Sequence, residues 1–493
     1  MVQKQLKFII LTAILLLKNK LRISSEIQPI ILKKIFLLVV FFVLIQGSSW
    51  AQDSYRMRKL SSFNNPNLPK VDGTDIWNDL TGYFDPIKKR EYIICGGTDS
   101  VYVFDITDAK NMVRVSAVGG VSIFARNRDY ETYKHYAYCV SDQGSGVGAL
   151  QIFDLQYLPD SIHLVYQSNE LGTFTHTIFI DSVSERMYMS SNLKPSGFSA
   201  MDIISLRDPE KPTMMCSLNV PKKPGGFPLF NIVHEMFARH DTVYLSCGDP
   251  GLYIFDVRDT ANHVLIGSIN SYPDQGYNHS SWLDKTGKYL MFTDENMGLD
   301  IKIFDIHTLS NPQFISQFNS NANTTSHNAY WVGNFAYVSA YHDGVRVYNI
   351  ADPSNPKQVA WYDTHPETPE IYGGYKGCWG VYPYLPSHHI IASDLTSGIY
   401  VFEIDSELVS VESNPEPSLE VNIFPNPSTG KFKVSSPFNK VSFELRNTIG
   451  ELILTETNWD SNSEINLSQY PEGVYFITLS LGSNQITKKL MKW

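Results

Sequence analysis

One sequence pattern is repeated seven times along this chain of 493 residues. In each copy an alternating apolar run ends at an acidic or amide residue, crosses a turn rich in Asp, Asn and Pro, and alternates again. The stretch HDGVRVYNIADPSNPKQVAWYD, residues 342–363, is the clearest copy. Successive closing residues are 49, 48, 54, 49, 44 and 54 positions apart, a period near 50, and they are Asp105, Asp154, Asp202, Asp256, Asp305, Asn349 and Glu403.

Each copy has the pattern of four short strands. In the sixth copy the alternating runs cover residues 327–332, 334–340, 344–350 and 356–363. Period-two alternation indicates strands, and proline marks the corner between the third and fourth because it presets the turn and cannot join a central ladder. Four-stranded repeats of about 50 residues are typical of propeller blades. The sequence therefore predicts an all-β fold, a seven-bladed β-propeller.

The ends of the repeat array predict how the ring closes. The first copy begins at Asn78 and the last ends near Ile404. The segment before Asn78 is free to supply an outer strand beside the last blade. Such an arrangement would protect an otherwise bare sheet edge.

The first 51 residues have the features of a leader. Lys33 and Lys34 precede an apolar run at 35–45, and the small-residue site at Ser49 and Ala51 predicts cleavage after Ala51. That run is too short for a membrane-spanning helix, so we expect no transmembrane span in the mature protein. A second apolar stretch starts at Phe8, and the sequence leaves open whether it belongs to an unusually long leader or to an over-long start.

Composition changes again after the seventh copy. A polar, proline-bearing stretch separates the repeats from a small β-rich tail that suits a compact sandwich. The expected organisation is a leader at 1–51, a propeller at 52–408, a linker at 409–420 and a tail domain at 421–493.

Charge and cysteine usage narrow the functional classes. A formal net charge of −10 argues against nucleic acid as a partner, because phosphate backbones require a basic surface. Five cysteines, none in a C-x-x-C pair, fall mostly at matching places in strand-like runs. We expect Cys95, Cys139 and Cys247, which lie at these matching places, to be buried apolar residues and not disulfide partners.

The tail resembles the type IX secretion system sorting domain of Bacteroidetes-type bacteria. The matching stretches are FPNPSTGKF at 424–432, NTIGELI at 447–453, LSQYPEGVYFI at 467–477 and the basic end TKKLMKW. The resemblance implies that the type IX machinery is a partner, that the protein crosses the outer membrane, and that it is surface-attached or extracellular.

The repeats resemble the choice-of-anchor B family, which is built from LVIVD-type repeats. The resemblance covers residues from about 70 to 405 and rests on stretches such as REYIICGGTDSVYVFDITD at 90–108 and SHNAYWVGNFAYVSA at 326–340. It implies a displayed or secreted propeller and carries no established reaction.

Four histidines stand at the start of the first strand in four consecutive copies. They are His176, His234, His279 and His327. First strands line the central channel of a propeller, so these positions should converge on the axis. Neutral imidazoles there could bind one transition-metal ion, and, by analogy only, carotenoid oxygenases hold iron with four histidines in a seven-bladed propeller. Asp294 and Glu295 are candidate second-shell partners, although solvated loop acids would have the same pattern.

The alternative interpretation of the histidines is polar lining of the channel. Two functions follow, and no strong catalytic motif decides between them. The first is a surface or secreted binding module, whose ligand would be a surface glycan or a protein. In such a module the glycine-rich aromatic stretch at 372–384 could stack on sugars, although its aromatic side chains could also pack internally. The second is a metal-dependent enzyme that uses the histidine site.

Overall fold

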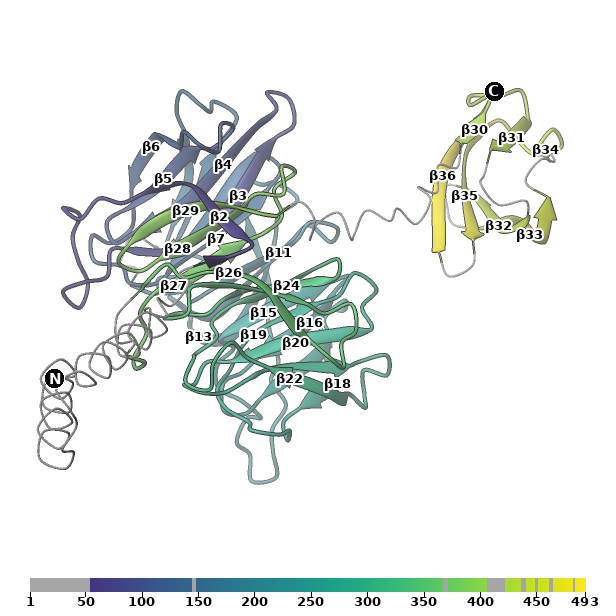
Figure 1. Ribbon diagram of the computed structural model, residues 1–493. Coiled ribbons are helices and arrows are strands. Elements are labelled where there is room, and N and C mark those ends of the chain that lie inside the picture. The colour runs from purple at the N-terminus through teal and green to yellow at the C-terminus, as the bar shows by residue number, and fades with distance from the viewer. Residues whose placement is uncertain are drawn as a thin grey trace, which may run out of the picture. The chain divides into compact units, whose positions relative to one another are not determined.

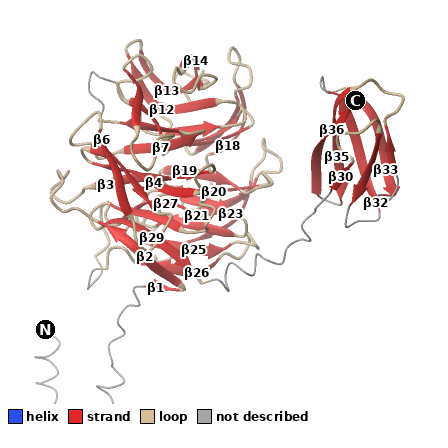
Figure 2. Cartoon of the chain, turned by 90° about the horizontal axis from the view of Figure 1, so that it is seen from above, coloured by secondary structure: helices blue, strands red, loops and turns tan. Residues whose placement is uncertain are grey.

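A computed structural model describes residues 54–143, 148–366, 371–405, 422–435, 440–447, 451–460, 464–481 and 484–493. The expected leader at 1–51 and linker at 409–420 lie outside the described residues. Within these ranges every regular element is a β-strand (Figure 2). No helix long and apolar enough to cross a membrane is present in this part of the chain.

Seven antiparallel units of four strands follow one another along the repeats (Figure 1). Blades 1 to 4 are β3 to β6 (Trp77–Asp85, Arg90–Gly97, Ser100–Asp105, Val113–Gly119), β7 to β10 (Arg128–Tyr133, Tyr136–Ser141, Leu150–Asp154, His163–Ser168), β11 to β14 (Ile178–Asp181, Arg186–Lys194, Gly197–Ser205, Thr213–Ser217) and β15 to β18 (Glu235–Arg239, Thr242–Ser246, Leu252–Asp256, Val264–Ile269).

The remaining blades have the same meander order. Blades 5 to 7 are β19 to β22 (Asn278–Leu283, Tyr289–Asp294, Ile301–Asp305, Gln313–Phe318), β23 to β26 (Ala329–Val332, Phe335–Ser339, Val345–Asn349, Lys357–Tyr362) and β27 to β29 (Cys378–Tyr382, Ile390–Asp394, Gly398–Ile404) with β2 (Met57–Phe63). A two-residue strand, β1 (Ser54–Tyr55), precedes β2 in the chain. The all-β propeller prediction is confirmed.

The ring closes through the N-terminal strand, as the sequence predicted. Strand β2 pairs antiparallel with β29, from Met57 opposite Ile404 to Phe63 opposite Ile399. Gly398 has φ of +118°, and a Cβ there would lie 2.1 Å from the Phe63 carbonyl oxygen, so only glycine permits this approach. The innermost strands of neighbouring blades also contact one another, including β27 with β3, and β27 contacts blade 6 at its second strand, β24.

One closing residue was assigned wrongly from the sequence. Strand β13 runs on to Ser205, which pairs with Arg186 as Asp256 pairs with Thr242 in the next blade. Ser205 is therefore the closing residue of the third copy. Asp202 lies three positions earlier, where Lys194 Nζ binds its carboxylate at 2.7 Å. The β12–β13 hairpin is longer than the other hairpins and carries an acidic residue, Asp202, within its second strand. In the sequence this residue resembles the acidic or amide residue that ends the third strand of the other copies.

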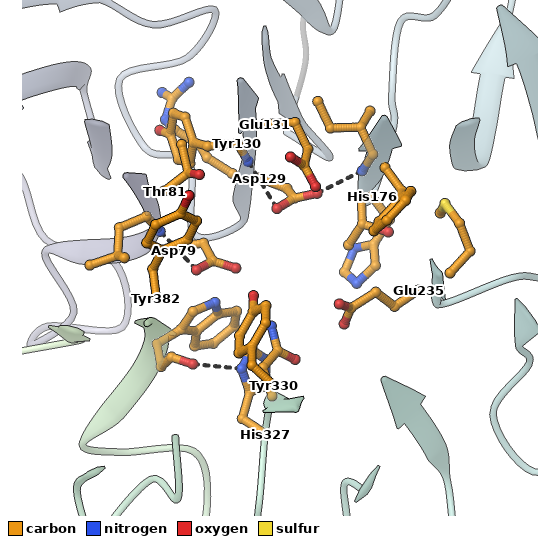
Figure 3. A pocket seen from close by; sticks show the side chains of 18 of the residues that line it. Asp79, Thr81, Asp129, Tyr130, Glu131, His176, Glu235, His327, Tyr330 and Tyr382 are labelled. Carbon is orange, nitrogen blue, oxygen red and sulfur yellow. Dashed lines mark hydrogen bonds between the residues drawn. The ribbon is translucent and has the colours of Figure 1, made fainter. Parts of the chain in front are cut away.

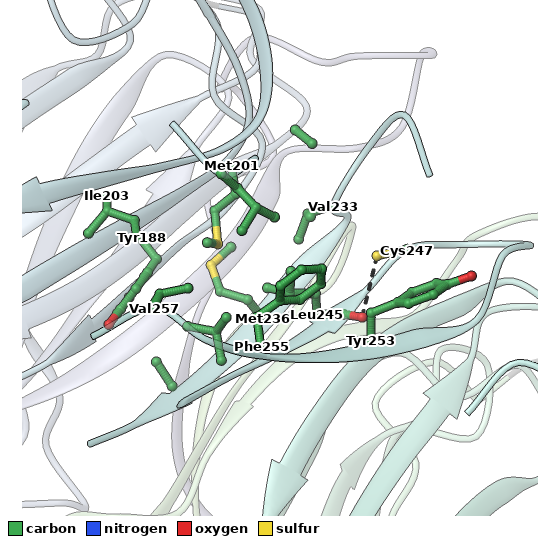
Figure 4. Close-up of a cluster of buried hydrophobic side chains, with 14 of the residues drawn as sticks. Tyr188, Met201, Ile203, Val233, Met236, Leu245, Cys247, Tyr253, Phe255 and Val257 are labelled. Atoms are coloured by element: carbon green, nitrogen blue, oxygen red, sulfur yellow. Dashed lines mark hydrogen bonds between the residues drawn. The ribbon is translucent and has the colours of Figure 1, made fainter. Parts of the chain in front are cut away.

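Apolar side chains fill the spaces between neighbouring blades. Between blades 3 and 4, Tyr188 and Met201 pack against Met236, Leu245 and Phe255 (Figure 4). Because each four-stranded sheet has two faces to bury, stacking on both neighbours is what stabilises it. The cysteine expectation is confirmed: all five are free thiols, Cys216 is half-buried, and the buried ones are Cys95, Cys139, Cys247 and Cys378.

The C-terminal tail is a small sandwich, as expected. One sheet has the order β30–β31–β34 (Asn422–Phe424, Lys431–Ser435, Glu464–Asn466), and the other has the order β33–β32–β35–β36 (Leu452–Asp460, Lys440–Asn447, Gly473–Leu481, Asn484–Lys492). Its core includes Phe432, Phe443, Leu445, Ile477 and Leu490, all nearly inaccessible to solvent.

Replacing Met57 by alanine tests the closing strand. Met57 is 4% exposed and packs with Val381 and Phe402 of the last blade. Loss of a buried methionine side chain should lower the free energy of unfolding by about 2–4 kcal/mol, measured by urea denaturation. Arg58 of the same strand provides the control: it forms an exposed pair with Glu403 of β29, so Arg58→Ala should cost less than about 1 kcal/mol. Equal, small effects of both changes would contradict closure through β2.

Candidate functional site

The blade architecture places all four predicted histidines at the inner ends of the first strands. His234 directly precedes β15, His279 is the second residue of β19, and His176 and His327 each stand two residues before a first strand. The backbone N–H groups of three of them donate to a carbonyl of their own second strand. These pairs are His176 with Ser190 at 3.2 Å, His234 with Ser246 at 2.7 Å, and His327 with Ser339 at 2.8 Å.

The four imidazoles form a continuous arc around the axis. Ring centroids are separated by 4.3 Å for His176 and His234, 4.2 Å for His234 and His279, and 4.4 Å for His279 and His327. The two Nε2 atoms of His176 and His234 are 3.0 Å apart. The structure thus brings together every histidine of the sequence prediction, and metal binding by them remains a prediction.

Hydrogen bonds at Nδ1 orient the two outer histidines of the arc. His327 Nδ1 lies 2.7 Å from the Trp379 carbonyl oxygen, which can only accept, so Nδ1 carries the hydrogen. His176 Nδ1 lies 3.1 Å from a carboxylate oxygen of Asp142. Fixing the hydrogen at Nδ1 leaves the lone pair on Nε2, which is the arrangement found in metal-binding histidines.

Hydroxyl groups hold the backbone of the histidines from the preceding blade. Ser190 Oγ donates to the His234 carbonyl at 3.0 Å, and Thr293 Oγ1 donates to the His327 carbonyl at 2.6 Å. Ser280 Oγ reaches the same His327 carbonyl at 3.2 Å. These contacts link His234 and His327 to the preceding blade as well as to their own, and so limit the movement of these two histidines.

Two glutamates complete the cluster. Glu295 Oε2 is 3.6 Å from His279 Nε2, and Glu295 Oε1 is 3.9 Å from His327 Nε2. On the other side, Glu235 Oε2 is 3.7 Å from His279 Nδ1. Two ligand sets result, His279–Glu295–His327 and His234–Glu235–His279, and within each set the potential ligand atoms lie within 4.8 Å of one another. Each set contains two histidines and one carboxylate.

The two acids predicted as second-shell partners have different roles. Glu295 lies directly against the imidazoles, close enough to be a ligand itself, and the Tyr341 hydroxyl donates to its carboxylate. Asp294 is turned away into blade 5, where Lys302 Nζ at 2.8 Å and Tyr272 Oη at 2.9 Å bind its carboxylate. Asp294 and Lys302 are both fully enclosed. This position for Asp294 contradicts a role beside the histidines and makes it half of a structural ion pair.

The arc of histidines separates two cavities. The first, which we call the carboxylate chamber, has a volume of about 300 Å³ (Figure 3). The second, the tyrosine chamber, has a volume of about 180 Å³. All four histidines line both chambers. Beyond them, Asp79, Asp129, Glu131 and Glu235 line the carboxylate chamber, and Arg126, Glu295, Tyr341 and Tyr375 line the tyrosine chamber.

Burial keeps the carboxylate chamber largely uncharged. Loss of solvent raises the pKa of Asp79, Glu131 and Glu235 well above their ordinary values, and the charge of Asp129 raises Asp79 and Glu131 further. Burial also raises the pKa of Asp129, to about 6, although backbone N–H groups of Ile178 and Tyr130 stabilise its ionised form. In the other chamber, burial raises the pKa of Glu295 to about 7, and the hydrogen bond from Tyr341 opposes this.

The same burial keeps the imidazoles neutral. Desolvation lowers the pKa of His234 and His279 well below the ordinary histidine value, and the neighbouring imidazoles lower it further. The pKa of His327 falls to about 3, mainly through burial. Neutral imidazole is the form that binds transition metals, so His234, His279 and His327 are in their ligating state at neutral pH.

The equivalent positions in the other three blades do not carry ligands of this kind. Arg128 occupies the position in blade 2, and its guanidinium donates to the carbonyls of Gly97, Thr98 and Ser122. Trp379 of blade 7 accepts the hydrogen bond from His327 through its carbonyl. Asp79 of blade 1 faces the carboxylate chamber (Figure 3).

Part of the aromatic stretch at 372–384 belongs to the site. The Tyr375 side chain is 47% exposed, and its ring centroid is 5.3 Å from that of Tyr341, so it borders the tyrosine chamber. Tyr384 and Tyr382 line the carboxylate chamber. This stretch therefore contains both packed and exposed aromatic side chains. Sugar binding by it stays a prediction.

Sequence reasoning missed several side chains of the site. Glu235 directly follows His234, so its position next to a predicted ligand could have marked it as a residue of the site. Asp129 and Glu131 follow Arg128 at the offsets that place side chains near the axis. Asp142 gave no signal, because it reaches His176 from the loop after β8 in the preceding blade.

Comparison with known proteins identifies the C-terminal tail. Residues 422–492 match the family model of the secretion system C-terminal sorting domain. The tail is a sorting domain. It indicates export from the cell through type IX secretion and a surface or extracellular location for the mature protein.

Two further similarities are more distant. An endo-acting ulvan lyase of Formosa agariphila is 28% identical over 146 residues, which cover 28% of this chain and 28% of the lyase. The chain thus matches little more than a quarter of that relative's length. Among solved structures, the β-propeller domain of Cps50 (Swd1) from Myceliophteria thermophila aligns with a TM-score of 0.46 and 12% identity, over 71% of this chain and 99% of that one.

Replacing Glu131 by glutamine tests the electrostatics of the carboxylate chamber. The folded-state pKa of Glu131 is raised above its unfolded value, so the native protein binds the extra proton and loses stability as pH rises from about 4.5 through the folded pKa. In metal-free protein, Glu131→Gln should match the wild type at pH 4 and be more stable at pH 8. The difference should grow by about 1.4 kcal/mol per pH unit inside that window.

Urea unfolding at several pH values measures this difference. The exposed Asp160 provides the control, since Asp160→Asn should leave the pH profile unchanged. A pH-independent difference between wild type and Glu131→Gln would show that Glu131 is solvated and ionised in the native state.

Proposed function

We propose that this protein is an exported metalloenzyme with a transition-metal centre on the propeller axis. The observation that carries the proposal is the set His279, Glu295 and His327. Adjacent ligand atoms on an ion with bonds of about 2.1 Å are roughly 3.0–3.4 Å apart. The separations of 3.6 and 3.9 Å between Glu295 and the two Nε2 atoms therefore need only a small contraction to enclose an ion.

The ligand count favours catalysis over a structural role for this centre. Structural zinc sites are closed by four protein ligands, whereas catalytic centres keep positions open. Two histidines and one carboxylate leave such positions, and the tyrosine chamber of about 180 Å³ lies beside them. A bound ion would supply positive charge that activates a small oxygen-containing molecule at these positions.

The protein groups around the open positions support this chemistry. Tyr341 donates a hydrogen bond to Glu295 and so fixes the orientation of the carboxylate. Its own pKa is raised well above the ordinary tyrosine value by burial, so it remains a hydrogen-bond donor at neutral pH. Arg126, held by Asp72 and Asp75 at 2.8 Å each, adds a fixed positive charge to the chamber wall. An anionic or oxygen-rich small molecule suits these surroundings.

The name of the lyase relative does not predict the substrate of the axial centre. The carboxylate chamber has a volume of about 300 Å³ and is bordered by four acids, so it is small for a polymer and unfavourable for a polyanion. A small molecule is the better candidate for the axial centre.

The family assignment of the repeats is part of this proposal. The stretches at 90–108 and 326–340 form strands of blades 1 and 6, as the choice-of-anchor B resemblance requires. We take the propeller at 52–408 to be of this type, carried outward by the sorting domain.

A separate observation supports the alternative function, a recognition module. The lengthened β12–β13 hairpin borders a groove of about 410 Å³ on blade 3, lined by Lys194, Phe198 and Pro228. Phe198 is 53% exposed and the nearby Phe227 is 75% exposed. Exposed aromatic rings beside a groove are suited to stacking on a glycan or a protein loop. The two functions can coexist, because the groove and the axial centre share no lining residue.

Metal titration of the mature protein tests the axial centre. Wild-type protein should bind Co²⁺ with visible absorption bands of nitrogen and oxygen ligation, and replacement of a ligand, as in His327→Ala or Glu295→Gln, should weaken binding roughly tenfold or more. The exposed His307 supplies a matched control, because His307→Ala should bind as the wild type does. If wild-type protein binds no Co²⁺ or Zn²⁺, the histidines are polar lining and the recognition module becomes the function.

Removal of residues 422–493 tests delivery. In a bacterium with type IX secretion, the truncated chain should remain in the periplasm, whereas the full-length chain reaches the surface or the medium. The propeller should keep its thermal transition, because its blades have their own core and the tail has a separate one. Fractionation and immunoblotting measure the distribution. Truncated protein outside the cell in normal amounts would refute a sorting role for the tail.

A further inference from the structure

His279 is unusual because a carboxylate faces each of its two ring nitrogens. Its side chain is only 2% exposed. Nδ1 lies 3.7 Å from Glu235 and Nε2 lies 3.6 Å from Glu295. Both separations exceed hydrogen-bond length, and Nδ1 is enclosed without a hydrogen bond of good geometry. Each gap is only slightly longer than the roughly 3.0–3.4 Å expected of two ligand atoms that share an ion.

The two carboxylates belong to opposite chambers. Glu295 lines the tyrosine chamber and Glu235 lines the carboxylate chamber. Each completes a set of three ligands that includes His279, with His327 in one set and His234 in the other. A neutral imidazole has a single lone pair and can serve one set only. An imidazolate has two and serves both.

We propose that the axial site binds two transition-metal ions bridged by the ring of His279. This inference rests on the proposed metal centre and extends it. One ion is bound by His279 Nε2, Glu295 and His327, and the other by His279 Nδ1, Glu235 and His234. Binding of the second ion releases the remaining ring proton of His279 to solvent, so the charge of the bridge changes from zero to −1.

His176 has a place in the second set that explains the fourth histidine. Its Nε2 lies 3.0 Å from His234 Nε2, a separation expected of adjacent ligands on one ion. With its Nδ1 hydrogen directed to Asp142, the Nε2 lone pair faces inward. The second ion therefore has four candidate ligands, and the first has three with open positions. This asymmetry gives the first ion the substrate-binding role and the second a supporting one.

The carboxylate chamber contains acids that can give up their protons beside a bound cation. Asp79, Asp129 and Glu131 border it together with Glu235. The single arginine among its lining residues, Arg128, directs its guanidinium to three backbone carbonyls. No lysine lines this cavity within the described residues. A divalent ion between His234, Glu235 and His279 would supply the positive charge that the protein itself does not place there.

Copper titration of the metal-free, full-length mature protein tests the bridge. Elemental analysis should give two Cu²⁺ ions per chain. Their electron paramagnetic resonance signal should integrate to far fewer than two spins, because an imidazolate bridge couples the ions antiferromagnetically. The isosteric Glu235→Gln should bind one ion with a normal, uncoupled signal, and so should Glu295→Gln at the opposite set. His307→Ala should retain two coupled ions.

The outcomes separate this inference from the proposed function. One uncoupled ion in the wild type would overturn the bridge and leave the single metal centre standing. No bound ion would overturn both. Two ions with a full, uncoupled signal would overturn His279 as the shared ligand. His279→Ala removes a buried ring, so its folding is checked by circular dichroism, and the two glutamine variants decide the question if it does not fold.

Discussion

Pairing of β2 with β29 is the constraint on which the site depends. Without it, blade 7 lacks its outer strand and the ring has no fixed circumference. The inner strand ends converge on one axis only because seven blades close a circle, and β27 then contacts β3. Four histidines from blades 3 to 6 are thereby brought to ring separations of 4.2–4.4 Å, although they span more than 150 residues of sequence. Closure is thus a condition for chemistry as well as for stability.

Low solvent access determines the chemistry of this axis. Burial disfavours charge, so His234 and His279 stay neutral while Asp79, Glu131 and Glu235 hold their protons. A cation that enters reverses this preference at both kinds of group, because it stabilises ionised carboxylates and needs imidazole lone pairs. Metal binding to the metal-free protein should therefore release protons. The folded ring has already brought the ligands together, so the ion does not have to assemble them.

The sequence predicted the repeated features well and the individual ones poorly. Strand pattern, blade number, the closing strand and the histidine positions all follow from periodicity, which each copy confirms independently. Asp202 was misplaced because the β12–β13 hairpin of its blade is longer than the others. Asp294 was misread because sequence cannot show that its side chain pairs with Lys302 inside the sheet. The contact of Asp142 with His176 depends on a loop path between blades, which no repeat encodes.

The pairing of β2 with β29 also sets the order of events during biogenesis. Arg58 and Glu403 are partners across 345 residues, so the first strand to leave the ribosome is among the last to find its place. Until the seventh blade has formed, β2 remains an unpaired edge that can pair with other chains. Contacts between such distant residues form slowly. We therefore expect this one pairing, and not the folding of any single blade, to be the slow step in completing the ring.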